Sequence, residues 1–331
     1  MRVLLWPIHG GYTDAFVRGD HEYLLPIEAG TDADPSLTAW GWTRTQQVPA
    51  DRLRDEHIDV VVLQRLEELD ECVRLTGRVP GRDVPAVFLE HNTPQPEAVT
   101  RSHPLAERTD IPIVHVTHFN QLVWDSGRAA TFVVEHGVPD PGPLYSGELE
   151  RVGVVVNEPV RRGRVVGTDL LPRFGLEAPV DVFGMGGEEL RAAFDGTGAV
   201  VPAGDLPPER LHRELARRRV YLHPFRWTSL GLSLLEAMHL AMPVVALATT
   251  EAVRAVPPGA GVISTNIADL RAAVRAFLAD PDWAHEIGRR GREHALAHYG
   301  LDPFLARWDD VLSQVAATHP HDRARRTSVA R

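Results

Sequence analysis

The stretch TSLGLSLLEAMHLAMPVVAL, residues 228–247, carries the clearest pattern in the chain. It predicts an apolar helix that opens at Gly231 and carries one acid, Glu236, followed by a hydrophobic strand after Pro243. A glycine at a helix start lets a ligand approach free backbone amides, and the helix dipole there favours phosphate. A carboxylate one or two turns further in can accept hydrogen bonds from ribose or sugar hydroxyls. A solvent-facing glutamate on an amphipathic helix would give the same pattern, so both interpretations of Glu236 stay open.

Strands and helices alternate on both sides of this stretch, which predicts an α/β fold. The candidate strands are RVLLWPI, EYLLPI, IDVVVLQ, AVFLEH, IVHVTH and TFVVEHG in the first half, and RVGVVVNE, PVDVFGMGG, GAVVPAG, RVYLHPF, MPVVAL and GVIS in the second. The candidate helices include PERLHRELARRR, LGLSLLEAMHLA, IADLRAAVRAFLA, PDWAHEIGRRGREHALAHY and DPFLARWDDVLSQVAA. We expect each half to form an open parallel sheet, and two such domains facing each other would enclose a cleft at the carboxyl ends of their strands.

The Pro/Gly-rich segment PDPGPLYSGE, residues 139–148, has the composition of a linker between domains. A chain of 331 residues also exceeds the size at which one hydrophobic core usually keeps growing. We therefore expect a first domain over residues 1–142 and a second over 143–302, with a last helix over 303–317 that packs back on the first domain. The segment 318–331 has almost no apolar residues and is expected to be a disordered tail.

The composition excludes several classes of function. All 35 basic residues are arginine, and without lysine the chain cannot form a Walker A loop or hold pyridoxal phosphate as a Schiff base. The formal net charge of −10 argues against nonspecific nucleic-acid binding, which depends on cationic side chains. No apolar run reaches the about 18 residues that a membrane-spanning helix needs, so we expect no integral membrane segment and a cytoplasmic protein.

The common patterns of cofactor and metal sites are also absent from the sequence. The first strand ends at His9-Gly10-Gly11, a tight turn without the GxGxxG dinucleotide fingerprint. The lone Cys72 can form neither an internal disulfide nor a CxxC zinc site, and the histidines contain no HExxH. We therefore predict no metal and no cofactor.

The stretch 228–247, with the TTEAV and GAGVIS that follow it, resembles the donor-binding segment of the retaining GT-B glycosyltransferases, particularly those of family 4 (group 1). Further matches follow in the expected order: the glycine loop at 9–11, AVFLEH at 86–91, EHGV at 135–138 and DVFGMG at 181–186. The resemblance implies the GT-B fold, in which two Rossmann-like α/β domains face each other across a cleft. The first domain would bind the acceptor and the second a nucleotide-sugar donor, with no metal.

Two acids in an E-x7-E motif mark the donor site of that family. Thr228 stands at the first acid here and Glu236 at the second. The resemblance implies that Glu236 binds the ribose and that Thr228 meets the donor sugar, where its hydroxyl can donate and accept a hydrogen bond. The remaining donor contacts would come from Gly184, Ser229, Leu230 and Gly231.

A basic pair after the first strand of the second domain holds the donor diphosphate in the family. The two positions fall on Asn157 and Arg162 here. Arg162 can grip a phosphate through two parallel hydrogen bonds, whereas Asn157 supplies no charge. Arg161, Arg164 or Arg226 could compensate, and arginines near one turn are also commonly an ordinary solvated surface.

The resemblance also assigns residues of the first domain. Gly10 and Gly11 would line the cleft, and His91 in LEHNTP would lie toward the acceptor or the anomeric carbon. His115 and His118 in VHVTHFN are competing candidates for that role.

These observations predict a glycosyltransferase that moves a hexosyl group from a nucleotide-diphosphate sugar to an unknown acceptor, with retention. A sugar, a lipid or a small molecule all stay open as acceptors. The alternative is a catalytically degenerate GT-B protein that binds a sugar nucleotide or a partner without transfer, motivated by the missing acid at 228 and the missing arginine at 157. A GT-B epimerase, or a phosphorylase that does not use pyridoxal phosphate, is a third possibility.

Overall fold

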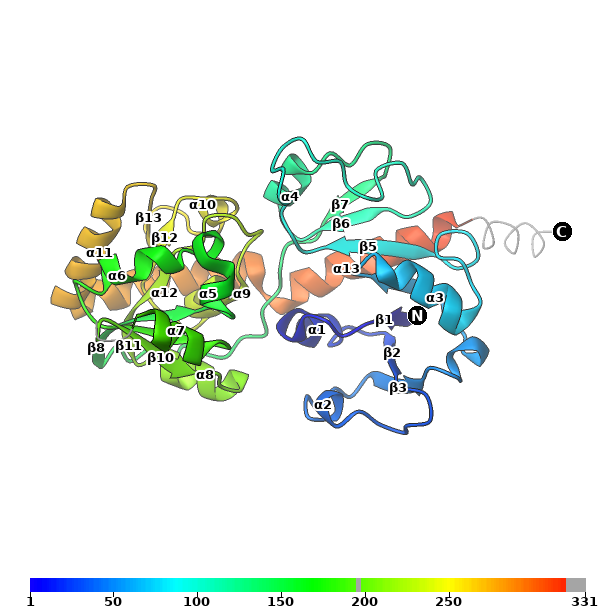
Figure 1. Ribbon diagram of the computed structural model, residues 1–331, viewed down its shortest axis with the longest axis horizontal. Coiled ribbons are helices and arrows are strands. Elements are labelled where there is room, and N and C mark those ends of the chain that lie inside the picture. The colour runs from blue at the N-terminus through cyan, green and yellow to red at the C-terminus, as the bar shows by residue number, and fades with distance from the viewer. Residues whose placement is uncertain (195–197, 320–331) are drawn as a thin grey trace. The chain divides into compact units, whose positions relative to one another are not determined.

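The structure is a computed structural model that describes residues 1–194 and 198–319, and it divides into two compact units (Figure 1). The first unit comprises Met1–Gly137 and the chain from Leu301 onward, and the second comprises Val138–Gly300. The division lies slightly before residue 142 because Val138 already packs in the apolar core of the second unit, where its amide donates to the Tyr299 carbonyl at 2.9 Å. Within the segment 318–331, Thr318 still ends a helix and His319 is buried, while residues 320–331 lie outside the described residues.

Among the described residues, the first unit forms a seven-stranded parallel sheet in the order β3-β2-β1-β4-β5-β6-β7. Every strand except β3 coincides with a predicted apolar run, because parallel strands covered on both faces are apolar throughout. The strands are β1 Arg2–Leu5, β2 Glu22–Ile27, β3 Thr45–Pro49, β4 Val60–Leu63, β5 Ala86–Glu90, β6 Ile113–His115 and β7 Thr131–Val133.

The sequence did not indicate β3, TQQVP, because it lies at the edge of the sheet and only Val48 is buried. An edge strand has one neighbour and needs fewer apolar side chains than a central strand. Its backbone still pairs with β2 over Thr45–Pro49.

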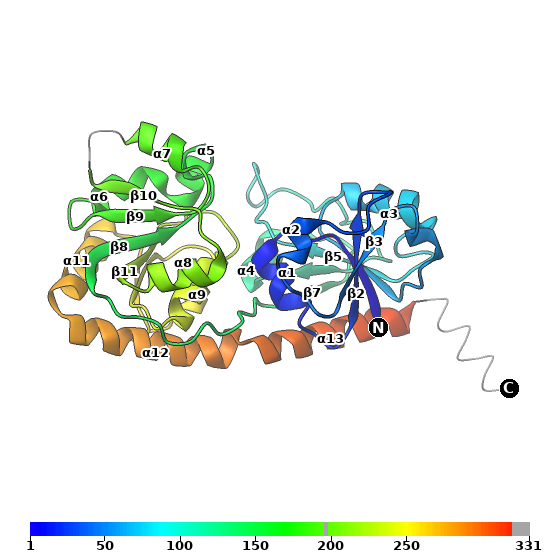
Figure 2. The same cartoon turned by 90° about the horizontal axis from the view of Figure 1, so that it is seen from below.

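Helices cover this sheet, and the last helix of the chain, α13, lies across β4 and β5 (Figures 1 and 2). Phe304 and Trp308 of α13 are buried, and the Trp308 indole nitrogen donates to the Tyr12 hydroxyl at 2.9 Å. The lone Cys72 is buried in the apolar core. The helices are α1 Gly10–Phe16, α2 Pro35–Thr38, α3 Glu67–Thr76, α4 His118–Val123 and α13 Leu301–Thr318, with a 3₁₀ turn η1 Leu53–Asp55.

The second unit forms a six-stranded parallel sheet over its described residues, in the order β10-β9-β8-β11-β12-β13. Apolar side chains of α6 and α11 pack on one face of the sheet and those of α9 on the other. The strands are β8 Leu149–Val155, β9 Val180–Phe183, β10 Val200–Gly204, β11 Arg218–His223, β12 Val244–Leu247 and β13 Val262–Ser264. The helices are α5 Pro159–Arg162, α6 Leu171–Phe174, α7 Gly187–Ala193, α8 Pro208–Leu215, α9 Leu232–His239, α10 Ala252–Ala255, α11 Ile267–Ala279 and α12 Pro281–Tyr299, with 3₁₀ turns η2 Gly163–Val166 and η3 Thr168–Leu170.

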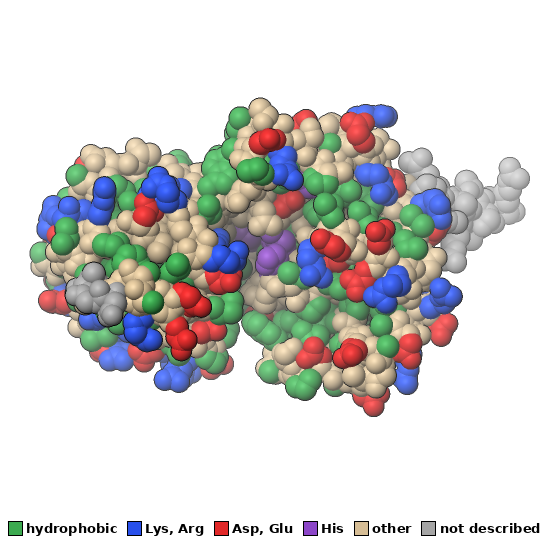
Figure 3. Space-filling model, viewed as in Figure 1, with side chains coloured by type: hydrophobic (Ala, Val, Ile, Leu, Met, Phe, Trp, Pro, Cys, Tyr) green, Lys and Arg blue, Asp and Glu red, His purple; other side chains and the backbone are tan. Residues whose placement is uncertain are grey.

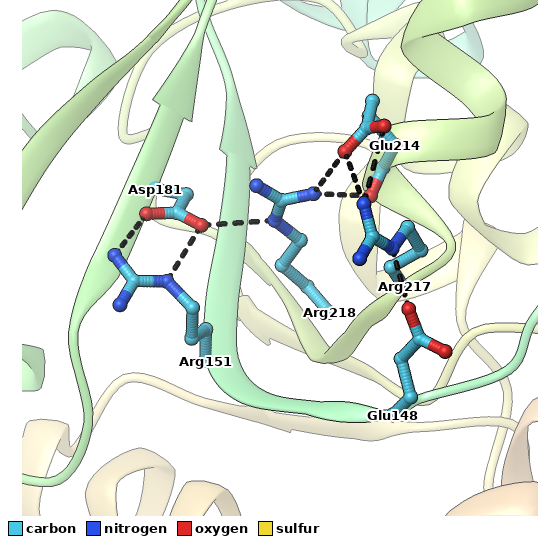
Figure 4. A network of polar contacts seen from close by, with 6 residues as sticks. All are labelled: Glu148, Arg151, Asp181, Glu214, Arg217 and Arg218. Atoms are coloured by element: carbon cyan, nitrogen blue, oxygen red, sulfur yellow. Dashed lines mark hydrogen bonds and ion pairs between the residues drawn. The ribbon is translucent and has the colours of Figure 1, made fainter.

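A network of ion pairs joins the strands of this sheet to α8 (Figure 4). Asp181 of β9 is buried and accepts from Arg151 of β8 and from Arg218 of β11, the latter at 2.9 Å. The guanidinium of Arg218 also forms an ion pair with the carboxylate of Glu214 in α8, at 3.0 Å. Because two guanidinium groups surround the one buried carboxylate, its charge is compensated inside the fold.

The turn from α9 into β12 contains a backbone conformation that a side chain seldom adopts. Ala241 has a φ of 66°, in the left-handed region that favours glycine. The Cβ of an alanine is therefore strained at this position. A Cβ on Gly288 of α12 would lie 2.0 Å from the Ala241 carbonyl oxygen. The helix α12 can therefore approach this turn so closely only through a glycine.

Candidate functional site

Three turns meet at the carboxyl edge of the second sheet, where open α/β sheets bind ligands. They follow the neighbouring strands β8, β9 and β11 and contain Asn157 to Arg162, Gly184 to Gly187, and Pro224 to Gly231. The Thr249 hydroxyl, which follows β12, donates to the Phe225 carbonyl at 2.6 Å and fixes the third turn. The described part of this edge therefore brings the predicted donor-site segments of the second half onto one sheet edge.

Arg162 differs from the other arginines of this edge because it makes no hydrogen bond or ion pair with a side chain of the described residues. Its guanidinium carbon lies 6.0 Å from the centre of the Phe225 ring. Burial, and then the neighbouring Arg161, lowers the pKa of Arg162 from its ordinary value. A guanidinium keeps its charge even so, and this one is available to an anion.

The other arginines that could have compensated for Asn157 are already paired with carboxylates. Arg161 pairs with Glu158. Arg164 and Arg226 both pair with Asp169, at 2.9 and 2.6 Å. The structure therefore brings four arginines near the edge, and Arg162 is the one of the four without an ion pair in the described chain.

Asn157 has a structural partner instead of an anion. Its side-chain oxygen accepts from the Met185 amide at 3.1 Å, which ties the turn after β8 to the turn after β9. Gly184 has a φ of 120°, and a Cβ there would lie 2.5 Å from the Val156 carbonyl oxygen. Asn157 thus joins the two turns by a hydrogen bond, and Gly184 allows them to approach closely.

Gly231 is the N-cap of α9, and no side chain caps this helix. A Cβ on Gly231 would lie 2.8 Å from the His223 ring and 3.1 Å from the Phe225 ring. Packing against these two rings therefore favours a glycine at this position. The amides of the first turn of α9 receive no side-chain acceptor, which is the arrangement that binds anions at helix starts.

His223 of β11 is the buried support of this turn. Burial lowers its pKa to about 3, so the ring is neutral. Its Nδ1 lies 3.4 Å from the Tyr221 hydroxyl, which donates to the Ser233 hydroxyl of α9 at 2.9 Å. His223 was not among the predicted site residues, although its position directly before Pro224 at the end of a strand was an available signal.

The residues between β11 and Gly231 differ in what they can offer a ligand. The Thr228 hydroxyl oxygen is buried and has no hydrogen-bond partner among the described residues, which leaves it available to a bound sugar hydroxyl. Ser229 is buried. The Leu230 side chain packs in the apolar core beside Leu234, so only the backbone of Leu230 can meet a ligand.

Glu236 lies on α9 and faces α8. Its carboxylate is 23% exposed and lies 3.9 Å from Nε2 of His212, too far for a hydrogen bond. The carboxylate therefore keeps its acceptor capacity, as a hydroxyl-binding role requires.

The predicted residues of the first unit lie at the carboxyl edge of the first sheet. The prediction of a tight turn and glycine loop at 9–11 is wrong for Gly10 and Gly11, because they are the first residues of α1. A Cβ on Gly10 would lie 2.7 Å from the ring of Trp40. The close approach of Trp40 thus explains why this position is a glycine.

His91 follows β5 and lies in a cluster of aromatic rings. Its ring centre is 4.2 Å from that of His9 and 4.7 Å from that of Tyr12. Burial, and then the nearby His9 and His136, lowers the pKa of His91 well below its ordinary value. His91 is therefore a neutral imidazole near neutral pH.

The two competing histidines have other surroundings. His115 is fully buried in β6, and burial with His103 nearby lowers its pKa to about 4. His118 begins α4, is half exposed and faces Glu135 at 3.9 Å. Of the three, His91 is the one that combines partial exposure with a ring cluster.

Charge is distributed evenly over the face shown in Figure 3, where acidic and basic side chains are interspersed. Within residues 1–194 and 198–319, no helix is long and apolar enough to cross a membrane. In the same residues, no three His, Cys, Asp or Glu side chains are grouped so that they could hold a metal ion.

Known proteins resemble this chain in part of its sequence and in its fold. Residues 188–294, which include α9 and the turn before it, match the family model described as glycosyl transferases group 1. The trehalose synthase of Rubrobacter xylanophilus is 39% identical over 79 residues, which are 24% of this chain and 19% of that protein. The chain therefore spans about a fifth of this curated relative.

Solved structures match over nearly the whole chain. Sucrose-phosphate synthase from Thermosynechococcus elongatus has a TM-score of 0.68 at 16% identity, covering 96% of this chain and 99% of its own. HepE of Anabaena, in complex with UDP and glucose, has a TM-score of 0.70 at 14% identity, covering 95% and 99%. The chain thus has the α/β fold of GT-B glycosyltransferases, and residues 188–294 of its second unit are similar to the glycosyl transferases group 1 family.

Proposed function

We propose that this chain is a glycosyltransferase that moves a hexosyl group from a nucleoside-diphosphate sugar to an acceptor with retention. The observation that carries the proposal is the unpaired guanidinium of Arg162. The Phe225 ring lies near this guanidinium and also near Gly231, which is the N-cap of α9, a helix without a side-chain cap. A free cation and free helix amides together match a diphosphate.

The chemistry follows from where charge develops. As the bond between the sugar and the diphosphate breaks, the leaving group gains negative charge, which Arg162 and the first amides of α9 stabilise. The Thr228 hydroxyl would meet the donor sugar and the Glu236 carboxylate the ribose. If the acceptor attacks from the face that the leaving group departs from, configuration is retained without a nucleophile from the protein.

The acceptor would bind at the residues of the first unit. Gly10 and Gly11 begin α1, and His91 lies in the ring cluster beside it. A neutral imidazole can accept a hydrogen bond from an acceptor hydroxyl.

Replacing Arg162 by glutamine tests the carrying observation. We expect Arg162→Gln to weaken nucleoside diphosphate binding by about 10- to 100-fold, because a hydrogen bond to a charged group is worth about 1.5–3 kcal/mol. Calorimetric titration with UDP, GDP and dTDP measures the affinities, and UDP is the first choice because the HepE structure contains it.

The matched control is Arg161→Gln, which removes a guanidinium one residue away that already pairs with Glu158. Its affinity should stay within about twofold of the parent. Equal losses in both variants would show that general positive charge, not Arg162, binds the diphosphate.

The second candidate is a protein that binds a sugar nucleotide without transferring the sugar. It is favoured by Thr228, because this position offers a hydroxyl where the glycosyltransferase motif has a carboxylate. Incubation of the purified protein with UDP-, GDP- and dTDP-sugars and a set of acceptors separates the two. Tight nucleotide binding with no turnover of any donor would favour the binding protein.

A further inference from the structure

The side chain of Gln64 connects the ends of three neighbouring strands in the first unit. Gln64 follows β4, which lies between β1 and β5 in the sheet. Its side-chain nitrogen donates to the carbonyl of Trp6, after β1, at 2.6 Å. Its side-chain oxygen lies 2.8 Å from Nε2 of His91, after β5.

These two contacts fix the orientation of the amide. The Trp6 carbonyl oxygen can only accept a hydrogen bond, so the NH₂ of Gln64 must point toward it. The oxygen of Gln64 then faces His91, and because that oxygen can only accept, Nε2 of His91 must carry the hydrogen. The ring is thereby held as the Nε2–H tautomer.

A buried carboxylate holds the backbone of Gln64 in place. Glu68 of α3 is fully buried, and it accepts from the Gln64 amide at 2.6 Å. The same carboxylate accepts from the Arg65 side chain at 3.0 Å. Gln64 is therefore fixed through its main chain as well as through its amide group.

The other nitrogen of His91 is left without a partner. No further hydrogen bond of the His91 ring is present in the described chain. The groups around the ring are His9 and Tyr12 of the α1 start, His136 after β7, and Gln64. In a neutral imidazole with hydrogen on Nε2, Nδ1 carries a lone pair that accepts a hydrogen bond.

We propose that Gln64 is a positioning residue that holds His91 as the Nε2–H tautomer and so presents Nδ1 as an acceptor to a substrate hydroxyl. The part that concerns substrate rests on the proposed function, whereas the tautomer does not. Gln64 acts through His91 and does not itself touch the reacting atoms.

Two substitutions at Gln64 should change His91 in different ways. In Gln64→Lys the ammonium only donates, so Nε2 becomes the acceptor and the hydrogen moves to Nδ1. In Gln64→Glu the carboxylate faces Nε2 and favours the imidazolium, which raises the pKa of His91 by about 1 to 3 units. A role in packing alone would produce neither pattern.

Long-range ¹⁵N–¹H correlation spectra of the full chain, labelled on histidine, report these states directly. His91 is assigned by the signals that disappear in His91→Gln. We expect the Nε2–H pattern in the parent, the Nδ1–H pattern in Gln64→Lys and a titration at higher pH in Gln64→Glu. An Nδ1–H pattern in the parent, or unchanged His91 signals in both variants, would overturn the proposal.

The matched controls are Gln121→Lys and Gln121→Glu. Gln121 lies on α4 in the same unit and donates to the Thr131 hydroxyl at 3.0 Å, without contact to His91. These variants should leave the His91 signals as in the parent. A change of the same kind in them would show that the effect is one of charge in the unit rather than of the Gln64 contact.

Activity tests the substrate half separately. Where the parent transfers sugar, Gln64→Lys should lower kcat tenfold or more and leave the affinity for UDP unchanged. An inverted tautomer with unchanged kcat would overturn the substrate role and keep the tautomer. A parent without transfer would contradict the proposed function and leave the spectroscopic result standing.

Discussion

At the scale of single residues, Ala241 has a strained backbone conformation that lowers the stability of the fold. Its φ of 66° lies in the left-handed region, where the Cβ of an alanine costs about 1–2 kcal/mol. Glycine adopts this region freely but loses more chain entropy on folding, about 0.4–1 kcal/mol. The position is therefore better suited to glycine.

We expect Ala241→Gly to raise the free energy of unfolding by about 1 kcal/mol. Urea unfolding followed by circular dichroism measures the change. Ala272→Gly on the exposed side of α11 is the control and should lower stability by about 1 kcal/mol, because its backbone is helical. Equal destabilisation by both substitutions would contradict the strain at Ala241.

His115 gives the stability of the first unit a dependence on pH. Its pKa in the folded protein is lowered to about 4 by burial and by His103, from an ordinary value of 6.5. The unfolded chain therefore binds a proton that the folded chain does not, and stability is lost as pH falls from about 6.5 toward 4.

Replacement of His115 by asparagine should flatten this loss by a few kcal/mol between those pH values, because a lowering of this size corresponds to about 1.4 kcal/mol per pH unit. Denaturant midpoints at a series of pH values test it. A His115→Asn profile as steep as that of the parent would count against this origin of acid sensitivity.

At the scale of elements, α12 approaches two turns through glycines: Gly288 faces the turn after α9, and Gly291 faces the turn before β13. A Cβ on Gly288 would lie 2.0 Å from the Ala241 carbonyl oxygen, and one on Gly291 would lie 3.0 Å from that of Ala260. The first distance requires backbone to move, whereas the second needs a shift of a few tenths of an ångström.

Gly288→Ala should therefore destabilise the second unit by about 3 kcal/mol, at the upper end of the range for overpacking, and Gly291→Ala by about 1 kcal/mol. Thermal unfolding of both variants, compared with the parent, gives the order. A larger loss of stability in Gly291→Ala than in Gly288→Ala would contradict the closer packing at Gly288.

Elements were also the scale at which the sequence predicted most. Apolar runs identified the buried strands β1 and β11 because central parallel strands are apolar on both faces. The polar edge strand β3 gave no such signal. Arg162 could be found because the motif spacing marks it, and Asp169 could not be seen to neutralise Arg164 and Arg226 because that contact depends on how η3 folds back. Gln64 was missed for the same reason, since its partners follow two other strands.

At the scale of the whole molecule, the first unit is completed by α13, which follows the second unit along the chain. Trp308 of α13 packs edge-on against Phe16 and donates to Tyr12. His21 pairs with Asp309 at 2.8 Å, and Phe304 fills the space that a Cβ on Gly137 would need. The core of the first unit is thus built from both ends of the chain.

Truncation of Trp308 tests how much α13 contributes to the stability of the first unit. Trp308→Ala should lower the stability of the first unit by about 3–5 kcal/mol, through the lost contacts and the cavity left behind. Trp308→Phe keeps most of the ring and should cost only about 1–1.5 kcal/mol, for the hydrogen bond to Tyr12. Denaturant unfolding followed at two probes separates the units. A Trp308→Ala protein within about 1 kcal/mol of the parent would show that α13 is peripheral.

The position of α13 also determines the order in which the chain can fold as it is synthesised. The strands of the first unit leave the ribosome first, but Tyr12 and Phe16 wait for Phe304 and Trp308, which are made after the entire second unit. Domains usually fold as they emerge from the ribosome, which synthesises about 5–20 residues per second. The second unit can therefore close first, while the apolar side chains that α13 will cover stay exposed for the time needed to translate it. During that interval the nascent chain exposes apolar surface of the kind that promotes aggregation.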